Sequence, residues 1–145
     1  MVAFTKINDF TEDLGDEIHN LTSDSLQLAL SNTAPASEAS NPTADGNGVV
    51  ANVTQVAYTN VSGGQPTLAS VTWTLSAGVA TLDAADEIIL ASGGAVPTFR
   101  YVYLFNNTAA AKNIIGLWDA GATIDLADGE QTTVTFNAAG ILTAT

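Results

Sequence analysis

Few side chains in this 145-residue sequence could carry catalysis or bind a metal, and they are scattered. His19 is the only histidine and cysteine is absent, so a histidine or thiolate cluster for zinc or iron cannot form. No serine lies in the Gly-x-Ser-x-Gly pattern of a nucleophile elbow, which argues against a serine hydrolase. We interpret His19 as a polar residue near the end of a helix, where the helix dipole favours it.

Two groups of oxygen-bearing side chains are weaker candidates for a catalytic or metal site. Asp83, Asp86 and Glu87 resemble the paired carboxylates of a hydrolase, but aspartates in a turn more commonly bond their own backbone. Asp45-Gly46-Asn47-Gly48 begins like a calcium loop, although the third oxygen ligand and the distal glutamate are missing. The sequence also lacks a glycine-rich phosphate loop. We therefore predict no enzymatic activity, no metal and no cofactor.

The charge balance narrows the choice of partners. Three Lys and Arg residues against fifteen Asp and Glu residues give a net charge of −12. This charge disfavours contacts that neutralise nucleic-acid phosphates or anionic lipid headgroups. No segment resembles a signal peptide or is apolar enough to cross a membrane. We expect a soluble, unprocessed chain whose partners include neither nucleic acid nor membrane.

The elements that must position these residues centre on a hairpin within 96–121. Every second residue of its first strand is aromatic: Phe99, Tyr101, Tyr103 and Phe105. Val102 and Leu104 lie between them, so both faces of the strand are apolar and need cover from a second sheet or a helix. Asn106-Asn107-Thr108 predicts the turn, and Ile114 to Trp118 predicts the returning strand.

The rest of the chain predicts short β-strands preceded by one helix. Apolar residues at helical spacing run from Ile7 to Leu21, with Asn8 or Asp9 as a possible N-cap. Residues 71–82 predict a hairpin with Val71, Trp73 and Leu75 directed inward. About eight strands separated by Gly, Asn and Asp turns indicate an antiparallel β-sandwich or barrel, in a single domain over 1–145. Its expected core contains Trp73, Tyr101, Tyr103, Phe105, Trp118 and Phe136.

A long polar segment, 31–48, interrupts this pattern. It is rich in small polar residues and has two prolines, so it predicts a loop or arm. Loops of this length in compact domains are commonly functional. We expect this arm, together with Met1 to Ile7, to contact neighbouring chains. The arm is too long and too poor in apolar residues to be packed as a connector, and Val2 and Phe4 precede the helix, where the fold itself has little use for them. The predicted partner-binding residues are Val2, Phe4, Asn32, Pro35, Pro42, Asp45 and Asn47.

Several motifs are similar to those of a known family. They are Phe99-Arg100-Tyr101 within the aromatic strand, Ile115-Gly116-Leu117-Trp118-Asp119, the turn at 128–130, and Val134-Thr135-Phe136. Together they resemble a family of small virion proteins of tailed bacteriophages, which has an F-R-Y strand and a G-W-W-D strand. In that family, a segment similar to Phe10–Leu14 and His19-Asn20-Leu21 comes first, followed by a strand and Asn32-Thr33-Ala34-Pro35. The chain departs at Leu117, where an aromatic is commoner, and in its low lysine content.

The resemblance implies a non-enzymatic virion component. We expect a capsid decoration, or cement, protein that binds the major capsid protein lattice on the outer surface of the phage head, after assembly in the host cytoplasm. Several weak contacts on a symmetric lattice favour a homo-oligomer, and a trimer at a symmetry axis is the expectation. One alternative is a tail or fibre component for assembly or host-glycan recognition, which would expose aromatics in loops, whereas Trp73 and Trp118 lie in strand patterns. The other, a small hydrolase, has little support from the residues.

Overall fold

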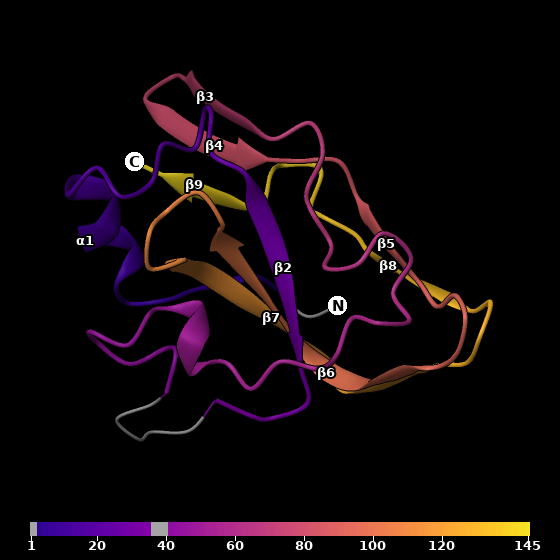
Figure 1. Cartoon of the computed structure of the whole chain (residues 1–145). Coiled ribbons are helices and arrows are strands. Elements are labelled where there is room, and N and C mark those ends of the chain that lie inside the picture. Colours follow the sequence, from indigo (N-terminus) through magenta and orange to yellow (C-terminus); the bar gives the residue numbers. More distant parts are fainter. Residues whose placement is uncertain (1–2, 36–40) are drawn as a thin grey trace.

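The computed structural model describes residues 3–35 and 41–145. Its elements, in chain order, are β1 (Thr5–Lys6), α1 (Phe10–Gly15), β2 (Leu26–Ser31), the 3-10 helix η1 (Val50–Asn52), β3 (Thr72–Ser76), β4 (Val79–Asp83), β5 (Glu87–Leu90), β6 (Val96–Asn106), β7 (Ile114–Leu126), β8 (Gln131–Val134) and β9 (Leu142–Ala144). They form three sheets with the strand orders β1-β7-β6-β2, β3-β4-β9 and β5-β8 (Figure 1). All strand pairs are antiparallel. The predicted class, a mainly β, sandwich-like fold with one short N-terminal helix, is confirmed.

The central hairpin predicted from the aromatic pattern is the pair β6 and β7. Tyr103 lies opposite Leu117, and Val102 lies opposite Trp118. Because residues that face each other across an antiparallel pair share a face, Tyr103 and Val102 mark the two faces of the sheet. Tyr103 is 1% exposed and Val102 is 0% exposed, so both faces are covered.

Different parts of the chain cover these two faces. On the Val102 face, Trp118 packs against Phe136, with ring centroids 5.4 Å apart, and Phe136 lies two residues beyond the end of strand β8. On the Tyr103 face the cover consists of loops rather than a sheet, and we call residues 32–35 and 41–55 the loop layer. Within it, η1 and the residues after it bring Val53 toward Tyr103. Gln55 forms a β-bridge to Ser31 at the end of β2. The sandwich is therefore sheet on sheet on one side and sheet on loops on the other.

The helix is shorter than predicted. It ends at Gly15, whereas the apolar spacing predicted a helix to Leu21. Glu17 has a φ of +61°, which turns the chain out of the helical path. The backbone N–H of Ile18 then donates to the Asp13 carbonyl at 2.9 Å. The apolar residues beyond Gly15 reach the core from a turn, which a periodicity of three and four does not distinguish from a helix.

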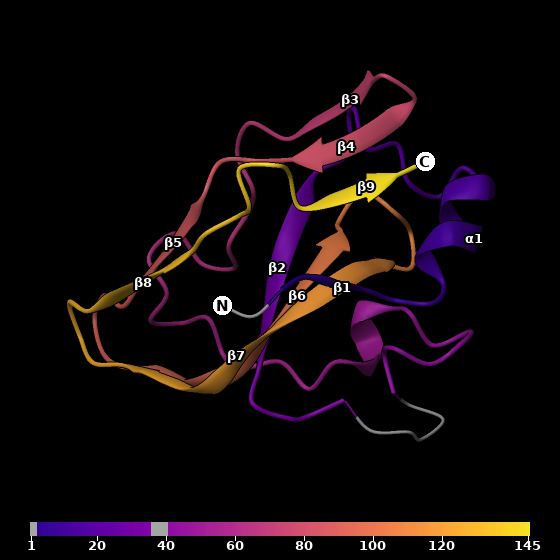
Figure 2. The same ribbon diagram turned by 180° about the vertical axis from the view of Figure 1, so that it is seen from behind.

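Five of the six predicted core aromatics are buried: Tyr101, Tyr103, Phe105, Trp118 and Phe136. Trp73 is half-buried against the core. The prediction that Leu75 points into the core is wrong, because its side chain is 75% exposed. The hairpin of β3 and β4 extends to the edge of the molecule in both views (Figures 1 and 2), so its tip has no second layer to pack on.

Candidate functional site

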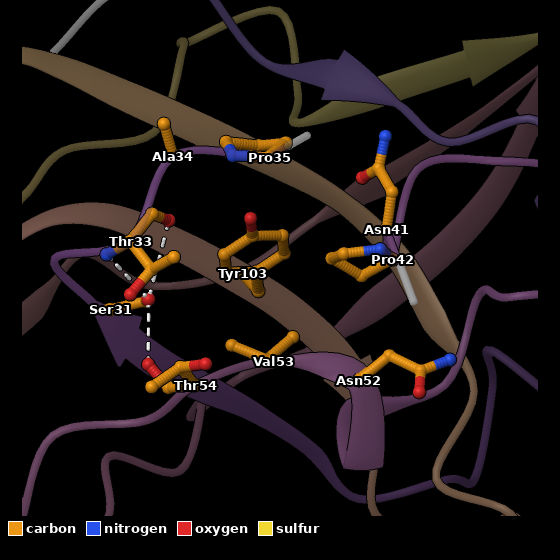
Figure 3. A pocket seen from close by; sticks show the side chains of 10 residues that line it. All are labelled: Ser31, Thr33, Ala34, Pro35, Asn41, Pro42, Asn52, Val53, Thr54 and Tyr103. Carbon is orange, nitrogen blue, oxygen red and sulfur yellow. Dashed lines mark hydrogen bonds between the residues drawn. The ribbon is translucent and has the colours of Figure 1, made fainter. Parts of the chain in front are cut away.

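A small pocket lies where the loop layer crosses β6 (Figure 3). Its walls come from the end of β2, the segments on both sides of residues 36–40, and the residues that end η1. The lining residues are Ser31, Thr33, Ala34, Pro35, Asn41, Pro42, Asn52, Val53, Thr54 and Tyr103. Its volume is about 150 Å³, which is roughly the space that holds one benzene ring and is below the roughly 300–1,000 Å³ of a typical small-molecule site.

Ser31 fixes two of the pocket walls. Its side chain is at the end of β2 and the residue is 1% exposed. The hydroxyl donates to the Thr54 carbonyl at 2.7 Å and accepts from the Thr33 backbone N–H at 3.1 Å (Figure 3). On the opposite wall, the Asn41 Oδ1 accepts bonds from both the backbone N–H and the hydroxyl of Thr43, each at 3.0 Å. The walls are therefore held by side-chain bonds to the backbone, which leaves little conformational entropy to lose on binding.

Tyr103 supplies an aromatic surface with a polar tip. Its hydroxyl points toward the Pro35 side of the pocket (Figure 3). Burial, with a smaller contribution from Tyr101, raises the pKa of Tyr103 to about 12. At neutral pH the phenol is uncharged and can donate or accept a hydrogen bond, but it cannot act as a base.

The far end of the loop layer is anchored on the helix N-terminus. Asp9 is the N-cap residue, yet its carboxylate makes no capping bond to the helix. Instead it accepts backbone N–H bonds from Gly46 and Gly48, each at 2.9 Å. Gly48 is packed closely here, because a Cβ on it would lie 2.6 Å from the Ile7 Cδ1. Residues 45–48 thus form a turn bound by Asp9, as expected for that sequence in preference to a calcium loop.

The predicted partner-binding residues fall into separate places. Pro35 and Pro42 meet at the pocket, where Pro42 is buried and Pro35 is half-buried. Asn32 and Asp45 are exposed on the loop layer, whereas the Asn47 carbonyl accepts a bond from the Asn52 side chain at 3.0 Å. The expectation that residues 31–48 are not packed is wrong for Ser31, Pro42 and Gly48, which are buried.

The two N-terminal residues of that prediction have different outcomes. Val2 lies outside the described residues. Phe4 is half-buried, and its ring centroid is 4.6 Å from that of Trp118. The assumption that the fold has no use for Phe4 is therefore wrong. Because Trp118 shares a face with Val102, Phe4 is on the side of the sheet opposite the pocket.

A buried polar cluster surrounds His19, which the sequence did not predict. His19 is 5% exposed and stacks on Phe10, with ring centroids 5.4 Å apart. Its Nδ1 is 3.2 Å from the Asn106 Nδ2, so Nδ1 accepts this bond and the proton is on Nε2. Nε2 is 3.7 Å from Asp13 Oδ2 and has no hydrogen-bond partner among the described residues. Burial lowers the pKa of His19, against the opposing effect of Asp13 and Asp24, so the ring is held neutral.

Asn106 organises that cluster and the hairpin turn together. It is 0% exposed, and its Oδ1 accepts backbone N–H bonds from Thr108 at 2.9 Å and Ala109 at 3.2 Å. Its Nδ2 carries two hydrogens: it donates to Asp24 and lies 3.2 Å from both the Ile18 carbonyl oxygen and the His19 Nδ1, which share the second hydrogen. The sequence signal was present, since an asparagine at the end of an apolar strand predicted the turn, but its contact with His19 spans 87 positions.

Arg100, Asp119 and Asp86 make structural contacts. Arg100 and Asp119, from the F-R-Y and L-W-D motifs, form a two-bonded ion pair, with Nε to Oδ1 at 2.7 Å and Nη2 to Oδ2 at 2.9 Å. Asp86 accepts the Phe136 backbone N–H at 2.8 Å, so its carboxylate bonds the backbone of a distant segment. Within residues 3–35 and 41–145 no cluster of His, Asp and Glu is suited to a metal ion, and no helix is long and apolar enough to cross a bilayer.

Comparison of the chain with protein-family models, with curated proteins and with solved structures gives no match.

Proposed function

We propose that this chain is a non-enzymatic structural protein of a tailed-phage virion, and that it acts as a capsid decoration protein bound to the major capsid protein. The resemblance to small phage virion proteins supports this proposal, and two of its motifs, Phe99-Arg100-Tyr101 and Ile115 to Asp119, lie on the central strand pair β6 and β7. The observation that carries the contact surface is the loop layer over Tyr103. It combines a fixed pocket of one-ring size with exposed polar residues on either side.

The pocket suits one protruding side chain of a protein partner. A partner's apolar or aromatic residue would pack between Pro35 and Val53, beside the neutral Tyr103 hydroxyl. Asn32 and Asp45, which are exposed, would form the polar rim of such a contact. Many copies on a lattice would multiply a weak single contact into firm attachment, which requires no catalytic residue.

The proposal is tested by adding the purified chain to capsids of the cognate phage prepared without it. We expect the chain to co-sediment with the capsids and to raise their resistance to heat. Ala34→Trp places a large side chain at the exposed rim of the pocket and should reduce capsid occupancy at least tenfold. Ala111→Trp, at an exposed position in the β6–β7 turn, is the matched control and should bind like the parent.

Two outcomes would contradict this assignment. Undiminished capsid binding by Ala34→Trp would exclude the pocket as the contact. Mass spectrometry of separated heads and tails decides between decoration protein and tail or fibre component, since the chain should be found in the head fraction. Its presence in tails alone would overturn the capsid assignment.

A further inference from the structure

The outer strand β3 has a free edge. It pairs with β4 alone, and the hairpin closes through Ala77 and Gly78, whose φ angles are +49° and +83°. These values are typical of a two-residue type I′ turn, in which the residues flanking the turn exchange backbone hydrogen bonds. By alternation, the N–H and C=O groups of Trp73 and Leu75 then point away from β4. In the described part of the chain no hydrogen bond reaches them.

Two side chains at this edge, Trp73 and Leu75, are apolar and only partly buried or exposed. Trp73 and Leu75 are on one face of β3, because they are two positions apart in a strand. Leu75 is 75% exposed, and Trp73 is half-buried beside Leu14 and Leu21. Leu75 is the most exposed large apolar side chain among the described residues.

The charge pattern indicates which partner could lie against the free edge of β3. The chain carries a net charge of −12, so two copies repel each other over most of their surface. Residues 46–82 and 131–145, however, contain no charged side chain, and they include all of β3 and β9. Natural edge strands are commonly protected by lysine, by proline or by a bulge. The β3 edge has neither of those residues and no charged side chain of its own, although Glu17 lines the pocket beside Trp73.

We propose that β3 pairs with β3 of a second copy, antiparallel, about a two-fold axis at Thr74. In this register the backbone of Trp73 faces that of Leu75 in the second copy, and the reverse, so all four free N–H and C=O groups of each strand find partners. Each exposed Leu75 covers the Trp73 of the other copy on the same face. The side chains and the free backbone groups are thus self-complementary, which an unrelated partner would match only by chance.

This contact differs from the capsid contact and from a trimer. The hairpin of β3 and β4 and the loop layer are at opposite ends of the molecule in both views (Figures 1 and 2), so both surfaces can be occupied at once. A two-fold interface gives dimers, whereas the expected trimer needs a three-fold one. The oligomeric state in solution therefore tests this inference without reference to capsid binding.

Sedimentation equilibrium over a wide range of concentrations gives the first test. We expect the 14.8 kDa chain to form dimers and to do so more tightly as added salt screens its charge. Leu75→Lys should be monomeric under the same conditions. Ile88→Lys makes the same change at the other exposed large apolar residue, which is 53% exposed on β5, and should stay dimeric. A monomeric parent, or a dimeric Leu75→Lys, overturns the proposal.

A cysteine pair tests the register and does not depend on whether Leu75→Lys folds. The chain has no cysteine, and the two Thr74 residues would form a non-hydrogen-bonded pair with Cα atoms about 4.5 Å apart, within disulfide range. Under mild oxidation Thr74→Cys should become a covalent dimer. Thr72→Cys, exposed on the same strand, would lie opposite Ser76 of the second copy and should stay largely uncrosslinked. Equal cross-linking of the two variants, or a trimer without cross-linking at Thr74, would exclude this pairing.

Discussion

The Asp9 carboxylate and the Gly48 backbone N–H form a 2.9 Å hydrogen bond that joins the start of the helix to the end of the loop layer, 39 positions along the chain. Together with the bond from Gly46, it holds the turn at 45–48 in a fixed position. The Gly48 carbonyl in turn accepts a hydrogen bond from the Ile114 N–H at 2.7 Å, so this turn also contacts β7. The position of the turn at 45–48 therefore depends on a residue in a different part of the sequence.

Asp9→Ala should loosen the turn at 45–48 and destabilise the fold. Backbone bonds to a charged carboxylate contribute about 1.5–3 kcal/mol each when they are well shielded, and because this site is only half-buried we expect a loss of about 1–3 kcal/mol in the free energy of unfolding. Urea denaturation measures it, and amide exchange at Gly46 and Gly48 should accelerate. Asp45→Ala, at the exposed neighbour, is the control and should stay within about 0.5 kcal/mol. An unchanged urea midpoint for Asp9→Ala would show that the anchor does not stabilise the fold.

Trp118→Ala tests the core on the other face of the sheet. Trp118 is 4% exposed and contacts both Phe4 and Phe136. Truncating a buried aromatic costs about 3–5 kcal/mol, a large part of the roughly 5–15 kcal/mol that stabilises an ordinary domain. Trp73→Ala should cost less, because Trp73 is only half-buried. Equal urea midpoints for the two variants would contradict this assignment of the core.

The sequence predicted the centre of the fold because that information is local. Alternating aromatics mark a strand, and the asparagines after it mark the turn, so β6 and its return needed no distant residue. Alternation also placed Trp73 and Leu75 on one face of β3. It does not show whether a second layer covers that face, and for Leu75 there is none.

The candidate site was less predictable because its walls are long-range contacts. The composition of residues 31–48 indicated a loop, but Pro42 is buried through contacts with residues that precede and follow it by many positions. The burial of His19 also depends on a long-range contact. The helical spacing predicted a helix beyond Gly15, whereas His19 is buried beside Asn106 on β6. Such contacts depend on the finished topology and leave no periodic pattern in the sequence.

Stability should fall when His19 is protonated. Burial lowers the pKa of His19 below its ordinary value of 6.5, so the unfolded chain binds the proton more tightly than the folded one. Stability is then fully present above pH 6.5 and declines as the pH falls below that value. His19→Gln removes the only histidine of the chain, and the difference between parent and variant in urea midpoints at pH 7.5 and 6 isolates this effect. A difference that is independent of pH would mean that His19 titrates equally in both states.

The Arg100 and Asp119 pair should also lose stability as the pH falls, but over a lower pH range. The hydrogen bond from Arg100, with a second from the Gly121 N–H, lowers the pKa of Asp119 from 3.8 to about 2. Its stabilising contribution is present above pH 3.8 and is lost as the pH falls toward 2. Arg100→Gln should raise this pKa, as measured by NMR titration of the carboxyl carbon. Lys112→Gln removes the same charge from the β6–β7 turn and should leave the Asp119 titration unchanged.

Gly116 tests the attachment of the N-terminal strand. It lies opposite Lys6 in the pairing of β1 with β7, and a Cβ on it would be 2.5 Å from the Thr5 carbonyl oxygen and closer still to the Phe4 ring. Gly116→Ala must therefore displace β1, and overpacking of this kind costs about 1–3 kcal/mol. Urea denaturation should show this loss, and exchange of the Ile7 N–H, which bonds the Ile115 carbonyl at 3.2 Å, should accelerate.

Gly15→Ala is the matched control for that change, because no atom lies within 4 Å of its Cβ position. It should be neutral or stabilise the chain by about 0.4–1 kcal/mol through the lower entropy of the unfolded state. The pair also separates the two roles of Phe4, as a core residue and as a predicted partner contact. If Phe4 contributes only to the core, the Gly116→Ala protein should occupy capsids normally at temperatures where it is folded. A folded Gly116→Ala protein that fails to bind capsids would instead show that the position of the N-terminal strand is part of the binding surface.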